Sequence, residues 1–166
     1  MNAGAYGGEM KDVLETVTVL TRDGDVKTLT KDELELGYRT SVIAKKDYIV
    51  LSAVIRLENG KKEEIKAVMD DLKEKRITKQ PLEYPSAGST FKRPEGYFAG
   101  KLIQDCGLKG FRVGDAVVSE KHSGFVINAG QATAADVIAL IRHVQQEVEE
   151  KFHVRIEPEV RLLGEF

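Results

Sequence analysis

The sequence predicts an α+β protein, because helix-like and strand-like segments alternate without the regular order of a doubly wound sheet. The chain has 166 residues, a length that allows one domain or two small lobes. Its hydrophobic content of 42% can supply a core, which argues against wholesale disorder. We expect a boundary near residues 79–85, since all four prolines follow residue 80 and proline ends regular elements.

The first forty residues predict a hairpin followed by a short helix. The turn sequence at residues 22–25 lies between β-branched stretches, a pattern typical of a β-hairpin. Thr30 and Glu33 resemble a capping box, which predicts a helix that begins there. Gly37 is placed to end this helix.

The middle of the chain predicts one strand, one helix and one loop. Residues 48–57 form an apolar, β-branched run of strand length. Residues 62–76 predict an amphipathic helix. Its apolar face comprises Ile65, Val68, Met69 and Leu72. Residues 77–88 then predict a loop.

The next segment predicts a short helix and two strands. The helix covers residues 98–106, and Gly107 ends it. Strands are expected at residues 113–119 and 124–128, with a turn between them.

The last segment predicts a long helix and a final strand. Thr133 caps the helix, with Asp136 at the third helical position. Its inward face is predicted to comprise Val137, Leu140, Ile141, Val144, Val148 and Phe152. Apolar and charged residues alternate over residues 154–162, which predicts a strand with one apolar face.

Charge and composition argue against several classes of protein. The chain has 25 basic and 27 acidic residues, a net charge of −2, unlike a dedicated nucleic-acid binder. No stretch without charged residues approaches the ~20 residues that span a bilayer, and the N-terminal segment lacks the features of an export signal. The single cysteine, Cys106, cannot form an internal disulfide, which suits a cytoplasmic protein. The three histidines share no metal-ligand spacing, so no metal site is expected.

Three short motifs contain residues that can carry chemistry. Residues 85–94, PSAGSTFKRP, combine a flexible Gly-Ser backbone with two cations, which suits either a diphosphate-like anion or an ordinary loop. Arg39 beside Tyr38 is either a bidentate clamp for a carboxylate or a surface residue. Glu159 follows Pro158 on the polar face of the predicted final strand, either in a special role or in a solvated, ion-paired face.

Seven segments, taken in order, resemble one family of flavoenzymes. They read NAGAYGGE, GYRTS, ITK, AGSTFKRP, AGKLIQDCGLKG, GFVINAG and EPEVRLLG, and together they span residues 2–164. These segments are similar to the C-terminal part of the UDP-N-acetylenolpyruvoylglucosamine reductase family. Members of that family act in the second step of bacterial peptidoglycan precursor synthesis.

The resemblance implies an NADPH- and FAD-dependent oxidoreductase. Its substrate would be UDP-N-acetylglucosamine enolpyruvate, and its product UDP-N-acetylmuramate. Hydride addition to the enolpyruvyl group leaves carbanion character beside a carboxylate, so that centre needs cationic stabilisation and a proton source. By the motif match, Ser89 is the proton donor, Arg39 neutralises the carboxylate, and Glu159 assists at the same centre.

The resemblance also implies the binding residues. The positions matched to substrate contacts are Tyr38, Lys79, Arg93 and His122, and those matched to the flavin are Arg76 and Gly88. Arg93 stands where the family usually has Asn, and no inserted tyrosine-bearing loop lies between residues 77 and 89. The chain therefore resembles the shorter class of these enzymes.

The domain organisation follows from the same resemblance. Residues 1–79 would be an incomplete C-terminal part of the FAD-binding domain, and residues 80–166 a small α+β substrate-binding domain. Family members carry a further N-terminal flavin lobe. We therefore expect this chain alone to bind FAD weakly or not at all, and to self-associate through the surface that the lobe would cover.

The resemblance implies that the enzyme is cytoplasmic. It also implies a role in cell wall biogenesis, cell shape, the cell cycle and cell division. Two other readings stay open at this point. In the first of these, the chain is an inactive fragment that acts at most as a UDP-sugar binding module. In the second, it is a self-associating fragment without a ligand.

Overall fold

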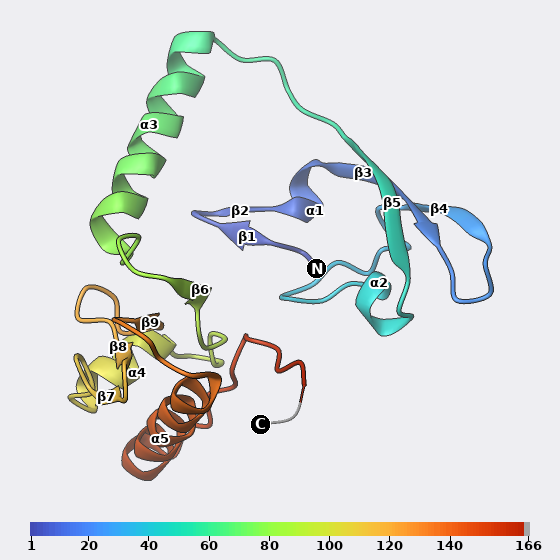
Figure 1. Ribbon diagram of the computed structural model, residues 1–166. Coiled ribbons are helices and arrows are strands. Elements are labelled where there is room, and N and C mark those ends of the chain that lie inside the picture. The colour runs from blue at the N-terminus through green and yellow to red at the C-terminus, as the bar shows by residue number, and fades with distance from the viewer. Residues whose placement is uncertain (165–166) are drawn as a thin grey trace. The chain divides into compact units, whose positions relative to one another are not determined.

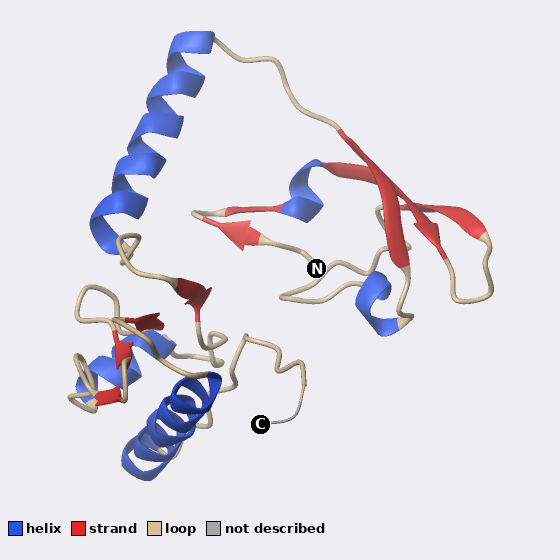
Figure 2. Cartoon of the chain, in the orientation of Figure 1, coloured by secondary structure: helices blue, strands red, loops and turns tan. Residues whose placement is uncertain are grey.

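The computed structural model describes residues 1–164, and it divides the chain into two compact units (Figures 1 and 2). Unit 1 is Met1–Leu72 and unit 2 is Lys73–Phe166. Each unit has its own hydrophobic core and contains both helices and antiparallel sheet. The predicted α+β class is therefore confirmed.

Unit 1 is built on a three-stranded antiparallel sheet. Its elements are β1 (Gly4–Ala5), β2 (Gly8–Glu9), α1 (Met10–Val13), β3 (Leu14–Leu20), β4 (Val26–Thr30), α2 (Val42–Lys45) and β5 (Ile49–Ile55). The order β4-β3-β5 puts β3 in the centre, and β1 and β2 form a separate small ribbon. Val17 and Val19 of β3 pack against Leu34 and Val42 to form the core of the unit. The predicted hairpin and the predicted strand at 48–57 are both confirmed.

The predicted helix after Thr30 is wrong, although its capping contacts are present. Glu33 Oε2 accepts the Thr30 N–H at 2.8 Å, and the Thr30 hydroxyl donates to the same oxygen at 2.7 Å. Residues 31–35 nevertheless form only a turn. Glu35 takes a left-handed conformation with φ 46°, which stops the helical path after one turn.

Helix α3 (Lys62–Lys79) confirms the predicted helix and continues three residues beyond it. Ile65, Val68 and Met69 of its apolar face are exposed and Leu72 is half-buried, so the helix contains no buried residue. The predicted loop at 77–88 is wrong at both ends, because α3 reaches Lys79 and strand β6 (Ser86–Ser89) begins before Gly88.

Unit 2 packs two helices against a four-stranded antiparallel sheet. Besides β6, its elements are α4 (Ala99–Asp105), β7 (Arg112–Val113), β8 (Ala116–Val118), β9 (Phe125–Asn128) and α5 (Ala134–Phe152). The sheet order is β6-β9-β8-β7. Leu140 and Val144 of α5 and Ile103 of α4 are fully buried in the core. The predicted helices at 98–106 and after Thr133 are confirmed.

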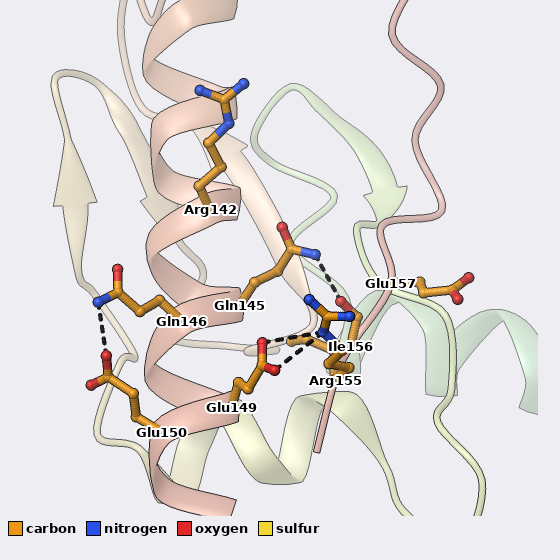
Figure 3. Close-up of a pocket in the computed structure, with 8 residues that line it drawn as sticks. All are labelled: Arg142, Gln145, Gln146, Glu149, Glu150, Arg155, Ile156 and Glu157. Carbon is orange, nitrogen blue, oxygen red and sulfur yellow. Dashed lines mark hydrogen bonds and ion pairs between the residues drawn. The ribbon is translucent and has the colours of Figure 1, made fainter. Parts of the chain in front are cut away.

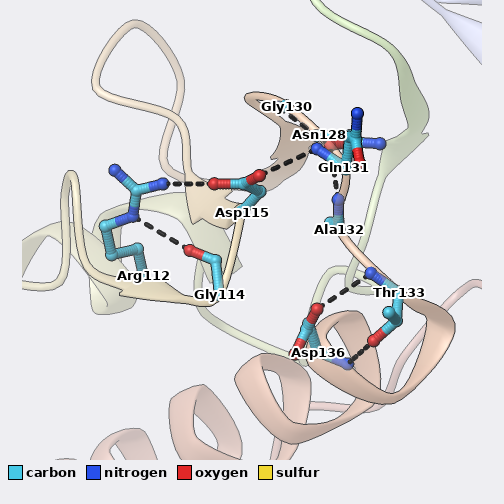
Figure 4. Close-up of polar contacts among 9 residues, drawn as sticks. All are labelled: Arg112, Gly114, Asp115, Asn128, Gly130, Gln131, Ala132, Thr133 and Asp136. Carbon is cyan, nitrogen blue, oxygen red and sulfur yellow. Dashed lines mark hydrogen bonds and ion pairs between the residues drawn. The ribbon is translucent and has the colours of Figure 1, made fainter.

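Side-chain hydrogen bonds set the beginning of α5 (Figure 4). Asp136 accepts the Thr133 N–H at 2.8 Å, and the Thr133 hydroxyl oxygen accepts the Asp136 N–H at 3.1 Å, which completes the predicted capping box. Asp115 accepts the Gln131 N–H at 2.8 Å and so ties the preceding loop to the β7–β8 turn. The N–H groups at a helix start have no partner within the helix, so such contacts fix where the helix begins.

The single strand predicted at 113–119 is wrong. A turn at Gly114, with φ 56°, splits this segment into β7 and β8, which pair with each other. Arg112 stabilises the turn by donating to the Gly114 carbonyl at 3.0 Å and to the Asp115 carboxylate at 2.8 Å.

The final strand predicted at 154–162 is also wrong. This segment makes one isolated bridge, between Pro158 and Phe91, instead of a strand. Its predicted alternation is partly correct, since Ile156 is buried and Val154 and Val160 are half-buried, whereas Leu162 is exposed.

His122 lies in the turn between β8 and β9, where its ring supports the backbone. Its Nδ1 accepts the Gly124 N–H at 3.1 Å, and its ring meets the Phe125 ring edge-on at 4.9 Å between centroids. Burial and the nearby positive charge of Lys109 lower the pKa of His122 from its ordinary value of 6.5. The neutral ring is therefore favoured in the folded state.

No helix within residues 1–164 is both long and apolar enough to cross a membrane.

Replacing Leu140 by Ala should destabilise unit 2 by about 2–5 kcal/mol, because its side chain is fully buried against α4 and the sheet. Leu82→Ala is the matched control, since Leu82 is 54% exposed and its loss should change stability by less than about 0.5 kcal/mol. Urea unfolding followed by far-ultraviolet circular dichroism measures both. Equal losses in the two variants would contradict the assigned core.

The stability of unit 2 should decrease as the pH is lowered, because of the protonation of His122. Above the ordinary pKa of 6.5 the ring is neutral in both states, so it contributes no pH dependence. Below that value the unfolded chain binds the proton more readily than the folded chain, and stability is lost. His122→Gln should therefore lose less stability than the wild type between about pH 7 and about pH 5 in urea unfolding. If the stability of the wild type and of His122→Gln changed identically with pH, this effect of His122 would be refuted.

Candidate functional site

Ser89 ends strand β6, directly after a β-bulge. Ser86 lies opposite Ile127 and Ser89 opposite Phe125, so β6 has one more residue than β9 between these two pairs. Gly88 occupies the bulge with φ 86°, a conformation that favours glycine. A Cβ at Gly88 would meet no atom within 4 Å, so the backbone is open on that side. The Ser89 side chain is exposed, and bulges commonly redirect a side chain in this way.

Glu159 lies on the chain segment that pairs with the residues after Ser89. We call residues 154–159 the strap. The Glu159 N–H donates to the Thr90 carbonyl at 2.7 Å, and the Lys92 N–H donates to the Glu157 carbonyl at 2.8 Å. The strap therefore runs antiparallel to residues 90–92. This pairing brings Ser89 and Glu159 to neighbouring positions on adjacent chain segments.

Contacts with α5 hold the strap in place (Figure 3). The Gln145 side chain reaches from α5 and donates to the Ile156 carbonyl at 2.8 Å. Arg155 pairs with Glu149 of α5 at 3.1 Å. The Ile156 side chain is only 2% exposed and belongs to the core. The strap is thus fixed by both packing and hydrogen bonds.

A second ion pair ties the strap to the segment after Ser89. Lys92 Nζ lies 2.9 Å from the Glu157 carboxylate, and this contact lowers the pKa of Glu157. Glu157 points away from α5 (Figure 3). Arg93 is exposed, and its Nε donates to the Tyr97 carbonyl at 3.3 Å. The Cζ atom of its guanidinium group lies 4.0 Å from the centre of the Phe98 ring.

The remaining predicted residues of unit 2 lie on α3 and in the β8–β9 turn. Arg76 and Lys79 are exposed on the last turn of α3, three residues apart and so on one face. His122 lies two residues before Gly124, whose carbonyl accepts the Thr90 N–H at 2.8 Å. Within unit 2, the structure therefore brings Gly88, Ser89 and Glu159 together around Thr90.

Arg39 and Tyr38 belong to unit 1, where a tight turn presents them. Two backbone hydrogen bonds join Gly37 and Thr40, and Arg39 takes φ 54° within that turn. The Arg39 guanidinium lies 5.2 Å from the centre of the Tyr38 ring. Tyr38 also forms a parallel bridge with the buried Asn2. A left-handed residue other than glycine is uncommon, and such residues cluster at functional sites.

Tyr38 and Arg39 line a cavity of about 450 Å³ in unit 1. Its other lining residues are Gly4, Ala5, Gly7, Gly8, Glu9, Lys11 and Asp12. Asn2 orders this wall, because its side chain donates to Glu9 and accepts the Lys11 N–H, each at 2.9 Å. Hydrogen bonds from Lys11 and Asn2 lower the pKa of Glu9.

The glycine backbone of this cavity is open to a ligand. A Cβ at Gly7 or Gly8 would meet no atom within 4 Å, so a ligand can approach the main chain there. Gly88 in unit 2 offers a similarly open backbone. Both features suit a cofactor such as FAD, whose ring and phosphates need close backbone approach.

Neither a metal site nor a cysteine nucleophile is supported. In the part of the chain that the structure describes, no three His, Cys, Asp or Glu side chains are arranged to hold a metal ion. Burial raises the pKa of the Cys106 thiol, whose Sγ lies 3.6 Å from the Glu147 carbonyl. A protonated thiol is a poor nucleophile, so Cys106 is a packing residue.

The predicted site residues do not include Thr90, the residue to which Glu159 is bonded. A threonine in a strand is common and gives no sign of a special role. The pairing between Thr90 and Glu159 joins residues far apart in the sequence, and no local pattern reveals it. The only sequence signal was Pro158, which indicates an edge or a bend.

Comparison with known proteins places these features in a family. Residues 80–163 match the model of UDP-N-acetylenolpyruvoylglucosamine reductase, C-terminal domain. The whole chain is 65% identical to the reductase of that name from Agathobacter rectalis and covers 53% of it. A similar protein from Exiguobacterium sibiricum is 62% identical over 99% of the chain, which covers 54% of that protein. The chain thus spans about half the length of the curated relatives it matches.

A solved structure supports the same relation. The crystal structure of UDP-N-acetylenolpyruvylglucosamine reductase from Thermus caldophilus aligns with a TM-score of 0.82 and 40% identity. The alignment covers 97% of this chain and 57% of that one. The matched family model covers just over half of the chain and contains Ser89 and Glu159. The resemblance found in the sequence motifs is confirmed, and the chain belongs to the UDP-N-acetylenolpyruvoylglucosamine reductase family.

Proposed function

We propose that the chain is the C-terminal part of an oxidoreductase that converts UDP-N-acetylglucosamine enolpyruvate to UDP-N-acetylmuramate. The observation that carries the proposal is the hydrogen bond from Glu159 to Thr90, the residue after Ser89, within the matched family domain. The names of the relatives support the reductase activity. The alternative, a UDP-sugar binding module without turnover, has no comparable support.

The proposal assigns the chain to peptidoglycan precursor synthesis in the cytoplasm, and so to cell wall biogenesis, cell shape and cell division. Residues 1–79 would contribute to an FAD-binding domain, and residues 80–166 would form the substrate-binding domain. Nothing in the composition favours nucleic acid as a partner.

The cofactors of the reaction would be FAD and NADPH. When bound, FAD that has been reduced by NADPH would supply the hydride for the enolpyruvyl double bond. Gly88 would allow close approach of the flavin, because its backbone is open, and Arg76 would contribute a positive charge. The glycine-rich cavity of unit 1 fits the same role.

The protein residues would stabilise and protonate the substrate centre. Arg39 would neutralise the substrate carboxylate and the negative charge that develops next to it. Ser89 would donate the proton to the carbanion carbon, and Glu159 would assist at that centre. A serine hydroxyl is a very weak acid, so it can act only when held within hydrogen-bond reach of a strongly basic carbon. The bulge and the strap are well suited to hold it there.

Four further residues would bind the substrate outside the reacting centre. They are Tyr38, Lys79, Arg93 and His122. Lys79 and Arg93 are exposed cations that suit a diphosphate or sugar. The Nδ1 of His122 accepts a backbone N–H, so the neutral ring has its proton on Nε2, where it can donate to a substrate oxygen.

Ser89→Ala should separate the two half-reactions. The test uses a chimera in which this chain replaces the matching residues of the Agathobacter rectalis reductase, which is 65% identical. Reduction of the flavin by NADPH should stay near the wild-type rate, since it needs no proton at the substrate carbon. Reoxidation by the enolpyruvyl substrate should slow by roughly 10³-fold or more. Stopped-flow absorbance of the flavin measures both rates.

Two companion variants make this test specific. Ser89→Cys should retain more of the reoxidation rate than Ser89→Ala, because a thiol can still donate a proton. Gln104→Ala, at an exposed position of α4, should leave both half-reactions unchanged. Wild-type reoxidation in the Ser89→Ala chimera would disprove the proton-donor role.

The chain alone should self-associate through β5 of unit 1. This strand lies at the edge of its sheet, carries no charged residue, and exposes every residue, including Ile49 at 61%. Such edges favour pairing with another strand, here that of a second copy. Analytical ultracentrifugation should show a dimer that Val54→Lys dissociates and that Val26→Lys, on the opposite edge, leaves intact. A wild-type monomer at high concentration would contradict this expectation.

A further inference from the structure

Thr90 lies where three segments of unit 2 meet. Its backbone N–H donates to the Gly124 carbonyl at 2.8 Å, and its carbonyl accepts the Glu159 N–H at 2.7 Å. Its side-chain Oγ1 accepts the Val126 N–H at 2.9 Å. The residue is 3% exposed. A single buried residue is therefore bonded to the β8–β9 turn, to β9 and to the strap.

The side-chain bond lies beside the bulge of β6. With Ser89 opposite Phe125, a regular antiparallel ladder would place residue 88 opposite Val126. The extra residue of β6 disturbs the ladder at this point. The Thr90 hydroxyl supplies an acceptor for the buried Val126 N–H there. A buried N–H without an acceptor is costly, so this side chain stabilises the bulged geometry.

We propose that Thr90 is a positioning residue for the site. Its hydroxyl fixes the Ser89–Thr90 backbone against β9, and its carbonyl holds the strap that carries Glu159. Thr90 acts through these two neighbours, because it is itself buried. Its effect on the reaction rests on the proposed function, whereas the positioning is a property of the chain alone.

The chemistry of the side chain supplies matched variants. Thr90→Val has nearly the same shape but removes the acceptor, so the Val126 N–H loses its side-chain partner. Thr90→Ser keeps the hydroxyl and removes only a methyl group. Thr90→Ala removes both groups and leaves more room beside the buried N–H. These three variants separate the hydroxyl from the packing volume.

Amide hydrogen exchange of the 166-residue chain, followed by NMR, tests the positioning. Thr90→Val should raise exchange at the Val126 and Glu159 amides by roughly ten- to hundredfold. Thr90→Ser should leave both amides near wild type. The Leu140 amide, in the buried part of α5, should stay protected and so report an intact fold. Wild-type exchange at Glu159 in Thr90→Val would overturn the proposal.

If Thr90→Val does not fold, the comparison of Thr90→Ala with Thr90→Ser carries the test. Faster exchange at Val126 and Glu159 in the alanine variant alone would support the role of the hydroxyl. Equal exchange in both variants would refute it.

The chimera tests the consequence for the reaction. Thr90→Val should slow reoxidation by the substrate by roughly tenfold or more and leave flavin reduction by NADPH unchanged. Thr90→Ser should restore the reoxidation rate. Slow reoxidation in Ser89→Ala together with a wild-type rate in Thr90→Val would overturn the positioning role. A wild-type rate in Ser89→Ala, with raised exchange in Thr90→Val, would instead reject the proposed function and leave the positioning intact.

Discussion

The backbone hydrogen bond from Glu159 to the Thr90 carbonyl is the contact on which the candidate site depends. Together with the bond from Lys92 to Glu157, it flanks the bridge between Phe91 and Pro158. Phe91 and Pro158 face each other between these two hydrogen bonds and exchange no backbone hydrogen bond themselves. A proline therefore fits there without leaving an acceptor unused. Since Ser89 immediately precedes Thr90, this short pairing is enough to place a hydroxyl and a carboxylate on neighbouring segments.

Packing interactions elsewhere in unit 2 determine where that contact lies. The capping box at Thr133 begins α5, whose apolar face fills the core of unit 2. From the polar side of this helix Gln145 reaches the strap, and the buried Ile156 side chain fixes the strap's distance from the sheet. The strap is therefore an outer layer held on a rigid helix, which is a sound support for the side chain that we propose to be catalytic. Loss of α5 packing would therefore free the strap and displace Glu159, although Glu159 itself would be unchanged.

Local signals in the sequence predicted the elements that depend on local chemistry. The capping box at Thr133 and the turn at residues 22–25 were correct because each is decided within a few residues. Thr30 and Glu33 make the same capping contacts, but the helix fails because Glu35 turns left-handed in a tertiary setting that no local pattern encodes. The strap was predicted as a strand because its alternation is real. Its single bridge and the contacts of Thr90 depend on partners some 34–69 residues away, so only the structure reveals them.

The most direct test of this account is to detect the hydrogen bond itself in the isotope-labelled chain. NMR can measure a scalar coupling across a hydrogen bond, between the amide nitrogen of Glu159 and the carbonyl carbon of Thr90. The bond from the Asn128 N–H to the Pro85 carbonyl, at 2.9 Å in the same unit, is the internal control. We predict that both couplings are observed. A coupling at Asn128 with none at Glu159 would show that the strap is not paired with the segment after Ser89, and would contradict the account.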